Sequence, residues 1–126
     1  MTDSFSVLLV DDDADTQSLF QDALDHYGIA LKVASDQAST LMALASFSPD
    51  VVVLDIFLQD TDGYKLLHTI RSLPQPVTCP IVATTAYYTS DTTGELQRQG
   101  FDGYLLKPLD PEGLVEYLQN IVKNSA

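Results

Sequence analysis

The feature that most constrains this chain is a regular alternation of short apolar runs with helical patterns along its whole length. The apolar runs lie at residues 5–10, 31–34, 51–54, 81–83 and 104–106. Each run is followed by a helical pattern, carried in turn by Leu19 to Tyr27, Ala38 to Ala45, Leu66 to Ile70, residues 91–99 and Leu114 to Val122. This alternation predicts an α/β fold, with a five-stranded parallel sheet covered by helices on both faces.

The helical patterns differ in how clearly they are marked. Asp36 can cap the second pattern, where Ala38, Leu41, Met42 and Ala45 fall at the spacing of a buried stripe. Asp110 followed by Pro111 is a typical helix start, and the stripe from Leu114 to Val122 predicts a well-packed last helix. In the segment 91–99, Leu96 is nearly the sole apolar residue and Gly94 lies in the interior, which predicts a weak helix.

The length of the chain limits its number of domains, and its net charge limits its partners. At 126 residues the chain predicts one domain, 1–126, with its core at about 5–123. The net charge of −12 argues against nucleic acid and anionic membranes as partners. No apolar stretch is long enough to span a bilayer and no signal peptide is recognisable, so a cytoplasmic location is expected. Fifteen of the eighteen acidic residues are aspartates, a residue type that caps helices and binds divalent cations.

Polar residues follow four of the apolar runs. They are Asp11 and Asp12, Asp55, Thr85, and Lys107. In an open parallel sheet, ligands bind beyond the carboxyl ends of the strands, so these side chains are expected to share one pocket. Clustered carboxylates raise one another's pKa, and a hard divalent cation such as Mg²⁺ relieves that repulsion. One carboxylate beside the cation could then act as a nucleophile toward a phosphoryl group.

Five motifs in order resemble the receiver domains of two-component response regulators. They are Val10-Asp11-Asp12-Asp13, Pro49 to Ile56, Asp62-Gly63, Thr85-Ala86, and Tyr104 to Pro108. The separations also resemble those of receivers: 43 positions from Asp12 to Asp55, 30 from Asp55 to Thr85, and 22 from Thr85 to Lys107. The resemblance covers Val7 to about Val122 and implies the flavodoxin-like, doubly wound fold with strand order 2-1-3-4-5 and five helices.

The resemblance also implies a role for each motif. Asp55 corresponds to the phosphoacceptor, which takes a phosphoryl group from a histidine of a sensor kinase or a phosphotransfer protein. Asp12 corresponds to a direct Mg²⁺ ligand, with Asp11 acting mainly through water, and the backbone carbonyl of Phe57 to a further ligand. On this reading the chain is a signalling domain, phosphorylated with Mg²⁺ as cofactor, and not a conventional enzyme.

Two further positions correspond to the family's switch. Thr85 would bond a phosphoryl oxygen and Lys107 would pair with it, while Tyr104 would turn inward as Thr85 moves. The signal would then leave through a protein-binding face formed by the fourth helix, the fifth strand and the fifth helix. The family commonly has a cis peptide at the position of Lys107-Pro108, so a cis bond is expected there. Gln59 stands where the family often has proline.

Three alternatives remain open beside the receiver. A haloacid-dehalogenase-like phosphatase would need an aspartate two residues after its nucleophile, where this chain has Phe57. A flavodoxin-like cofactor binder would need a Ser/Thr/Gly-rich loop where Asp11, Asp12 and Asp13 stand. A pseudo-receiver, folded but never phosphorylated, would not need the full set of site residues.

In receivers, the positions of Phe57 and Tyr87 flank the water that hydrolyses the acyl phosphate. Neither side chain here offers a carboxylate or amide, which predicts slow hydrolysis.

Overall fold

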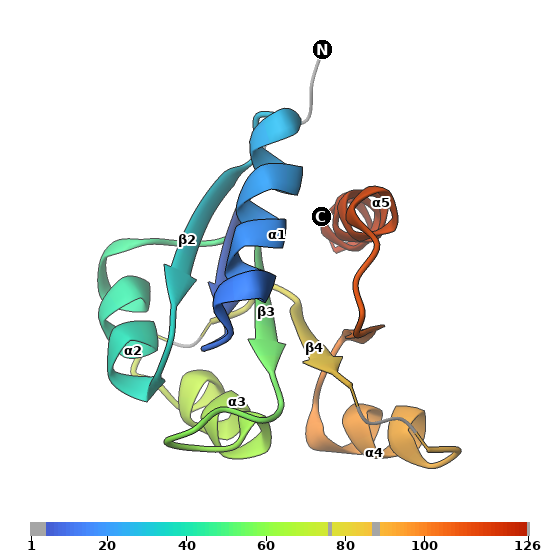
Figure 1. Cartoon of the computed structure of the whole chain (residues 1–126). Coiled ribbons are helices and arrows are strands. Elements are labelled where there is room, and N and C mark those ends of the chain that lie inside the picture. The colour runs from blue at the N-terminus through green and yellow to red at the C-terminus, as the bar shows by residue number, and fades with distance from the viewer. Residues whose placement is uncertain (1–4, 76, 87–88, 126) are drawn as a thin grey trace.

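The computed structural model describes residues 5–75, 77–86 and 89–125. Five parallel strands form one sheet in the order β2-β1-β3-β4-β5, as the sequence predicts (Figure 1). The strands are β1 Ser6–Val10, β2 Ala30–Ala34, β3 Val51–Asp55, β4 Ile81–Thr85 and β5 Gly103–Leu106. The helices are α1 Ala14–His26, α2 Gln37–Ser46, α3 Gly63–Arg71, α4 Thr92–Gln99 and α5 Pro111–Asn124.

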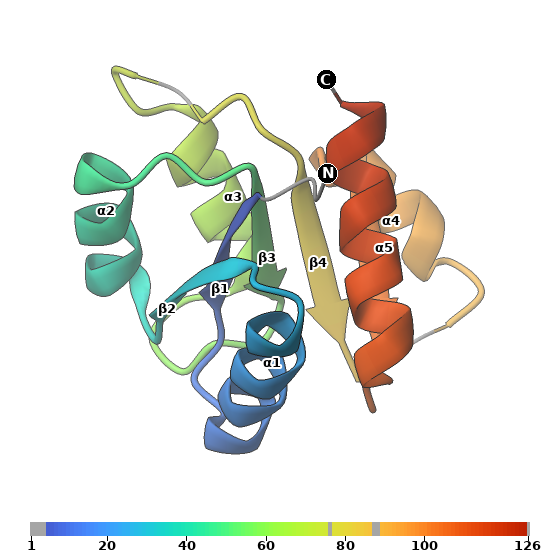
Figure 2. The ribbon, with the colours of Figure 1, turned by 90° about the horizontal axis from the view of Figure 1, so that it is seen from above.

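The sheet is packed on both faces, which explains why its central strands read as continuous apolar runs. On one face Val7, Leu9, Val53 and Val82 pack under α1 and α5, whereas the opposite face packs under α2, α3 and α4. Figure 2 shows the helices distributed around the sheet in this way. All five residues of β3 and all five of β4 are buried, so the carboxyl ends of these two strands are held rigidly.

Much of the aspartate excess caps helices. Four helices begin with an aspartate whose carboxylate accepts a hydrogen bond from a backbone N–H three residues later, at 2.8–2.9 Å. These caps are Asp13 for α1, Asp36 for α2, Asp62 for α3 and Asp110 for α5. At α4 the N-cap is Asp91, whose side chain makes no such bond, and Leu96 is the one buried residue of that helix. The segment does form a helix, and its one buried residue is the Leu96 that the sequence singles out.

The stripe predicted for α2 is wrong. Ala38, Met42 and Ala45 are exposed, Met42 by 74%, and the helix instead buries Thr40 and Ala43. Because α2 is apolar around most of its circumference, spacing alone does not show which side faces the sheet. The hydroxyl of Thr40 donates to the carbonyl oxygen of Asp36 at 2.7 Å, so this polar residue is buried without an unsatisfied group.

Smaller expectations have mixed outcomes. Tyr27, predicted to share the buried stripe of α1, lies at the C-cap of that helix and is half-exposed. The peptide bond between Lys107 and Pro108 is cis, as expected. Within the described ranges, no helix has the length and apolar character needed to cross a membrane.

Candidate functional site

Three carboxylates converge at the carboxyl edge of the sheet. Asp11 and Asp12 follow β1, and Asp55 ends β3, the neighbouring strand. Asp11 is fully buried and Asp55 nearly so, while Asp12 is partly exposed. One oxygen from each carboxylate lies within 4.8 Å of the others, which places three negative groups within reach of a single ion.

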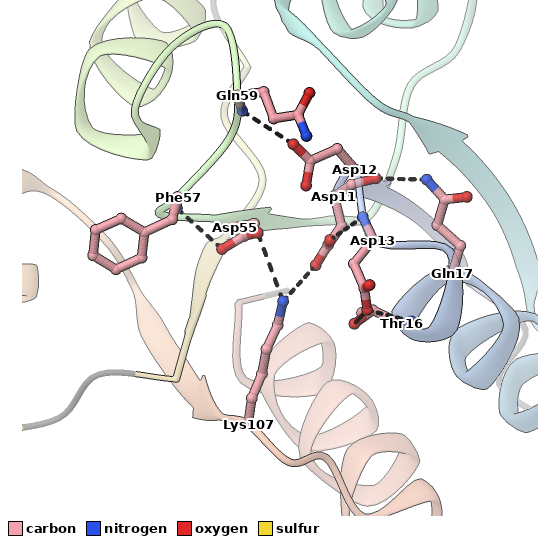
Figure 3. A network of polar contacts seen from close by, with 9 residues as sticks. All are labelled: Asp11, Asp12, Asp13, Thr16, Gln17, Asp55, Phe57, Gln59 and Lys107. Carbon is pink, nitrogen blue, oxygen red and sulfur yellow. Dashed lines mark hydrogen bonds and ion pairs between the residues drawn. The ribbon is translucent and has the colours of Figure 1, made fainter.

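Lys107 brings a positive charge to this cluster from the end of β5. Its Nζ lies 3.0 Å from Asp11 Oδ2 and 3.6 Å from Asp55 Oδ2, and Figure 3 shows it between the two carboxylates. The backbone N–H of Lys107 donates to the carbonyl oxygen of Thr85 at 2.9 Å, which fixes the start of this side chain against β4. The ammonium therefore compensates one of three negative charges.

Backbone N–H groups hold each carboxylate in place. Asp11 Oδ1 accepts from the N–H of Asp13 at 2.9 Å, and Asp55 Oδ1 accepts from the N–H of Phe57 at 3.1 Å. Asp12 Oδ2 accepts from the N–H of Gln59 at 3.0 Å, which ties the β3–α3 loop to β1 (Figure 3). Neutral donors orient these acids without cancelling their charge.

Two of these supports were not foreseen from the sequence. Gln59 contributes only its backbone N–H, a group that every residue except proline has, so its identity gives no signal. The side-chain amide of Gln17 donates to the carbonyl oxygen of Asp11 at 2.6 Å, and it reaches there from the first turns of α1. Predicting that contact would have required knowing how α1 is placed relative to the end of β1.

Burial and the neighbouring charges shift the pKa values of two groups in this cluster, Asp55 and Lys107. Burial raises the pKa of Asp55, and the neighbouring carboxylates of Asp11 and Asp12 raise it further against the opposing bond from Phe57 and the charge of Lys107. Burial on its own lowers the pKa of Lys107, but its hydrogen bond to Asp11 and the charges of Asp11, Asp55 and Asp13 outweigh it, so the net direction is upward. Lys107 is thus held as a cation, whereas the charge on Asp55 is destabilised in the protein alone.

This donor set fits Mg²⁺. All three side chains present hard oxygen ligands, which suit a cation that retains several waters. Burial and the neighbouring carboxylates of Asp11 and Asp12 raise the pKa of Asp55, and a cation bound beside Asp55 would favour its charged form. The residues that could hold the ion are Asp11, Asp12 and Asp55.

The two predicted switch residues lie on the same side of the sheet. Thr85 is buried at the end of β4 and pairs with Leu106 of β5, while Tyr104 pairs with Ala83. Side chains two residues apart share a face, so Tyr104 is a diagonal neighbour of Thr85. Tyr104 is half-buried against the core beneath α2, α3 and α4. Tyr87 lies outside the described residues.

Comparisons with known proteins agree with this geometry. The model of the response regulator receiver domain matches residues 7–119. The chain is 35% identical to a 14.6 kDa protein in the sodA1 3′ region of Leptolyngbya boryana, over 90% of this chain and 86% of that protein. It is 33% identical to the transcriptional regulatory protein TrcR of Mycobacterium tuberculosis, over 95% of this chain but 46% of the regulator. The chain therefore spans about half the length of that regulator.

A comparison with solved structures also finds response regulators. The crystal structure of a two-component response regulator from Clostridium difficile superposes with a TM-score of 0.85 at 30% identity, covering 94% of this chain and 96% of that one. The chain has a doubly wound sheet with an acidic cluster at the carboxyl edge, and the family model says which class of domain this is. The chain belongs to the response regulator receiver domain family.

Proposed function

We propose that this receiver domain accepts a phosphoryl group on Asp55, in a reaction that requires Mg²⁺. The observation that carries the proposal is the convergence of Asp11, Asp12, Asp55 and Lys107 at one open edge of the sheet. Asp55 faces Asp11 across the Lys107 ammonium, which lies between the two carboxylates (Figure 3). The donor would be a phosphohistidine of a sensor kinase or of a phosphotransfer protein, in the cytoplasm.

The transfer of the phosphoryl group forms one bond to phosphorus and breaks one. An oxygen of Asp55 forms a bond to phosphorus as the bond between phosphorus and the imidazole nitrogen of the donor breaks. The electron pair leaves on that nitrogen. Lys107 Nζ, 3.6 Å from Asp55 Oδ2, is placed to pair with a phosphoryl oxygen that acquires charge. The N–H of Phe57 keeps the other carboxylate oxygen oriented.

Asp11, Asp12 and the carbonyl oxygen of Phe57 are the residues we assign to Mg²⁺ beside Asp55. The bound cation would offset the repulsion between the carboxylates and the incoming phosphoryl oxygens. The bond between Gln59 N–H and Asp12 Oδ2 orients the exposed member of the acidic pair toward the site.

The output is a change of a protein-binding face. Thr85 would bond the phosphoryl group, and Tyr104, its diagonal neighbour on β5, would turn inward. The face formed by α4, β5 and α5 would then present a different surface to a downstream protein. Support comes from α4, whose single buried side chain makes it easy to displace.

The alternatives have less support. A phosphatase of the haloacid-dehalogenase type would require a proton-transfer group where Phe57 stands, and its side chain has none. A pseudo-receiver has no need of four convergent charged side chains, and here all four are present. A cofactor phosphate would meet three carboxylates at the end of β1.

Incubation with acetyl phosphate tests the proposal. The intact mass should rise by about 80 Da, the mass of one phosphoryl group, with Mg²⁺ and not with a chelator. Asp12→Asn should lose most of the labelling, whereas Asp60→Asn, an exposed acid of the β3–α3 loop, should keep it. Equal labelling with and without Mg²⁺ would overturn the metal requirement.

A further inference from the structure

A groove of about 620 Å³ opens beside the phosphorylation site, between α4 and the β3–α3 loop. Its lining includes Phe57, Tyr64, Thr85, Asp91, Glu95 and Leu96. Phe57 joins the two sites, because its N–H holds Asp55 while its ring points away from the carboxylates (Figure 3). The groove therefore presents a second surface, chemically unlike the acidic pocket.

The base of the groove is apolar and aromatic. Ile56 and Leu96 are almost fully buried beneath it. Phe57 is 57% exposed, and Tyr64, which also lines the groove, is partly exposed and packs its ring edge-on against Phe101 with centroids 5.9 Å apart. Two aromatic rings therefore border a space that is open to solvent.

The rim carries an excess of negative charge. Asp62, Asp91 and Glu95 line the groove with a single cation, Arg98, which is paired with Glu95 at 2.7 Å. Asp91 makes no capping bond with its side chain, so its carboxylate faces water. Burial raises the pKa of the Tyr64 hydroxyl, and the charges of Glu95 and Asp62 raise it further, in keeping with a negative potential in the groove.

These acids do not form a metal site. Among the described residues, the one group of three or more potential ligands close enough to hold an ion is Asp11, Asp12 and Asp55. The acids that line the groove come from two helices, Asp62 from the N-cap of α3 and Asp91 and Glu95 from the start of α4, and the same groove is lined by the apolar Ile56 and Leu96. That arrangement suits a cation on a long apolar stem, which can stack on aromatic rings while its charge meets separated carboxylates.

We propose that this groove binds an arginine side chain of a partner protein. The planar guanidinium would stack on Phe57 or Tyr64 and donate to Asp91 and Asp62, while its methylene stem covers Leu96. Arginine fits better than lysine because its planar group offers several donors, which suits acids contributed by both α3 and α4. Binding needs no phosphorylation of Asp55, so the two properties can be tested apart.

A titration of the full chain with Nα-acetyl-arginine methylamide, followed by ¹H–¹⁵N chemical shifts, tests this proposal. Saturable shifts are expected at Phe57, Tyr64 and Glu95, and the neutral isostere Nα-acetyl-citrulline methylamide should bind at least several-fold more weakly. Phe57→Leu, which keeps the apolar volume but removes the ring, should weaken binding about two- to fivefold.

Matched charge variants separate a site from general attraction to an acidic protein. Asp91→Asn should weaken arginine binding about two- to fivefold, and Asp25→Asn, an exposed acid on α1, should leave it unchanged. Asp91→Asn should still be phosphorylated by acetyl phosphate, so a failure of the groove does not mimic a failure at Asp55. Equal shifts from arginine and citrulline, or equal effects of the two variants, would overturn the proposal.

Discussion

At the scale of the residue, Asp55 must carry a negative charge although it is buried. It is buried among other acids, and its raised pKa means that folding disfavours its charged form. A carboxyl with a raised pKa in the folded state destabilises the fold at pH values above that pKa, and the penalty disappears as the pH falls through it. The site thus trades stability for a carboxylate ready to accept a cation and a phosphoryl group.

Asp55→Asn is therefore expected to stabilise the metal-free protein at pH 7. We expect an increase of about 1 kcal/mol in the free energy of unfolding, the usual scale of a single substitution, because asparagine carries no charge that must be buried. The gain should shrink as the pH is lowered toward the pKa of Asp55. Thermal denaturation in a chelator between pH 5 and pH 8 measures it, with Asp25→Asn as an exposed control. A less stable Asn variant would show that burial and repulsion of the Asp55 charge do not outweigh its favourable contacts.

Phe57 controls a different property, the lifetime of the phosphorylated form. Its ring points away from Asp55, so it does not cover the carboxylate, but it offers no polar group to orient an attacking water (Figure 3). We expect phospho-Asp55 to persist for minutes or longer and Phe57→Asn to accelerate hydrolysis about tenfold, equivalent to about 1.4 kcal/mol of barrier. The decay rate of purified phosphoprotein measures this. A lifetime of seconds, or no acceleration, would remove Phe57 from control of the water.

Single elements show how far the sequence predicts structure. The caps at Asp36 and Asp110 and the sparse apolar content of α4 could be read directly, because they depend on local residue types. The buried side of α2 could not, because apolar residues surround that helix and the choice is made by packing against the sheet, where α2 contacts β2. Spacing identifies a helix, and the sheet decides which of its sides is buried.

Alanine substitutions of Gly94, inside α4, and of Gly100, at its end, are expected to change the stability of the protein in opposite directions. Gly94→Ala adds a methyl group that meets only the mobile end of Arg98 at 3.3 Å, so it should stabilise the protein by up to about 1 kcal/mol and slow amide exchange in α4. Gly100 ends the helix with φ of 109°, so Gly100→Ala should destabilise by about 1 kcal/mol. Chemical denaturation and hydrogen exchange check both. Changes of the same sign would mean that helix propensity does not limit α4.

At the scale of the whole molecule, strand order assembles the site. The residues Asp12, Asp55, Thr85 and Lys107 follow or end four strands, and the order β2-β1-β3-β4-β5 makes those four strands consecutive in the sheet. The order and the acidic cluster were therefore predictable from the motifs as a set. The backbone bond from Gln59 to Asp12 and the groove beside α4 depend on loop paths, for which residue types give no signal.

Cation binding should stabilise the whole fold. A ligand that binds only the folded state adds about 2.7 kcal/mol when its concentration is one hundred times its Kd. Mg²⁺ is expected to raise the melting temperature of the unmodified protein and to leave that of Asp12→Asn nearly unchanged. Asp60→Asn should respond like the unmodified protein, because Asp60 bonds to the N–H of Gln37 and lies outside the cluster. An equal response of Asp12→Asn would place the ion elsewhere.

The central claim is that Asp55 itself carries the phosphoryl group, and locating the modification tests it most directly. After reaction with acetyl phosphate and Mg²⁺, borohydride reduction converts an aspartyl phosphate to homoserine, which peptide mass mapping can place in the chain. The account predicts homoserine at position 55 alone, and none in Asp55→Asn. Homoserine at Asp11 or Asp12, or undiminished labelling of Asp55→Asn, would contradict it.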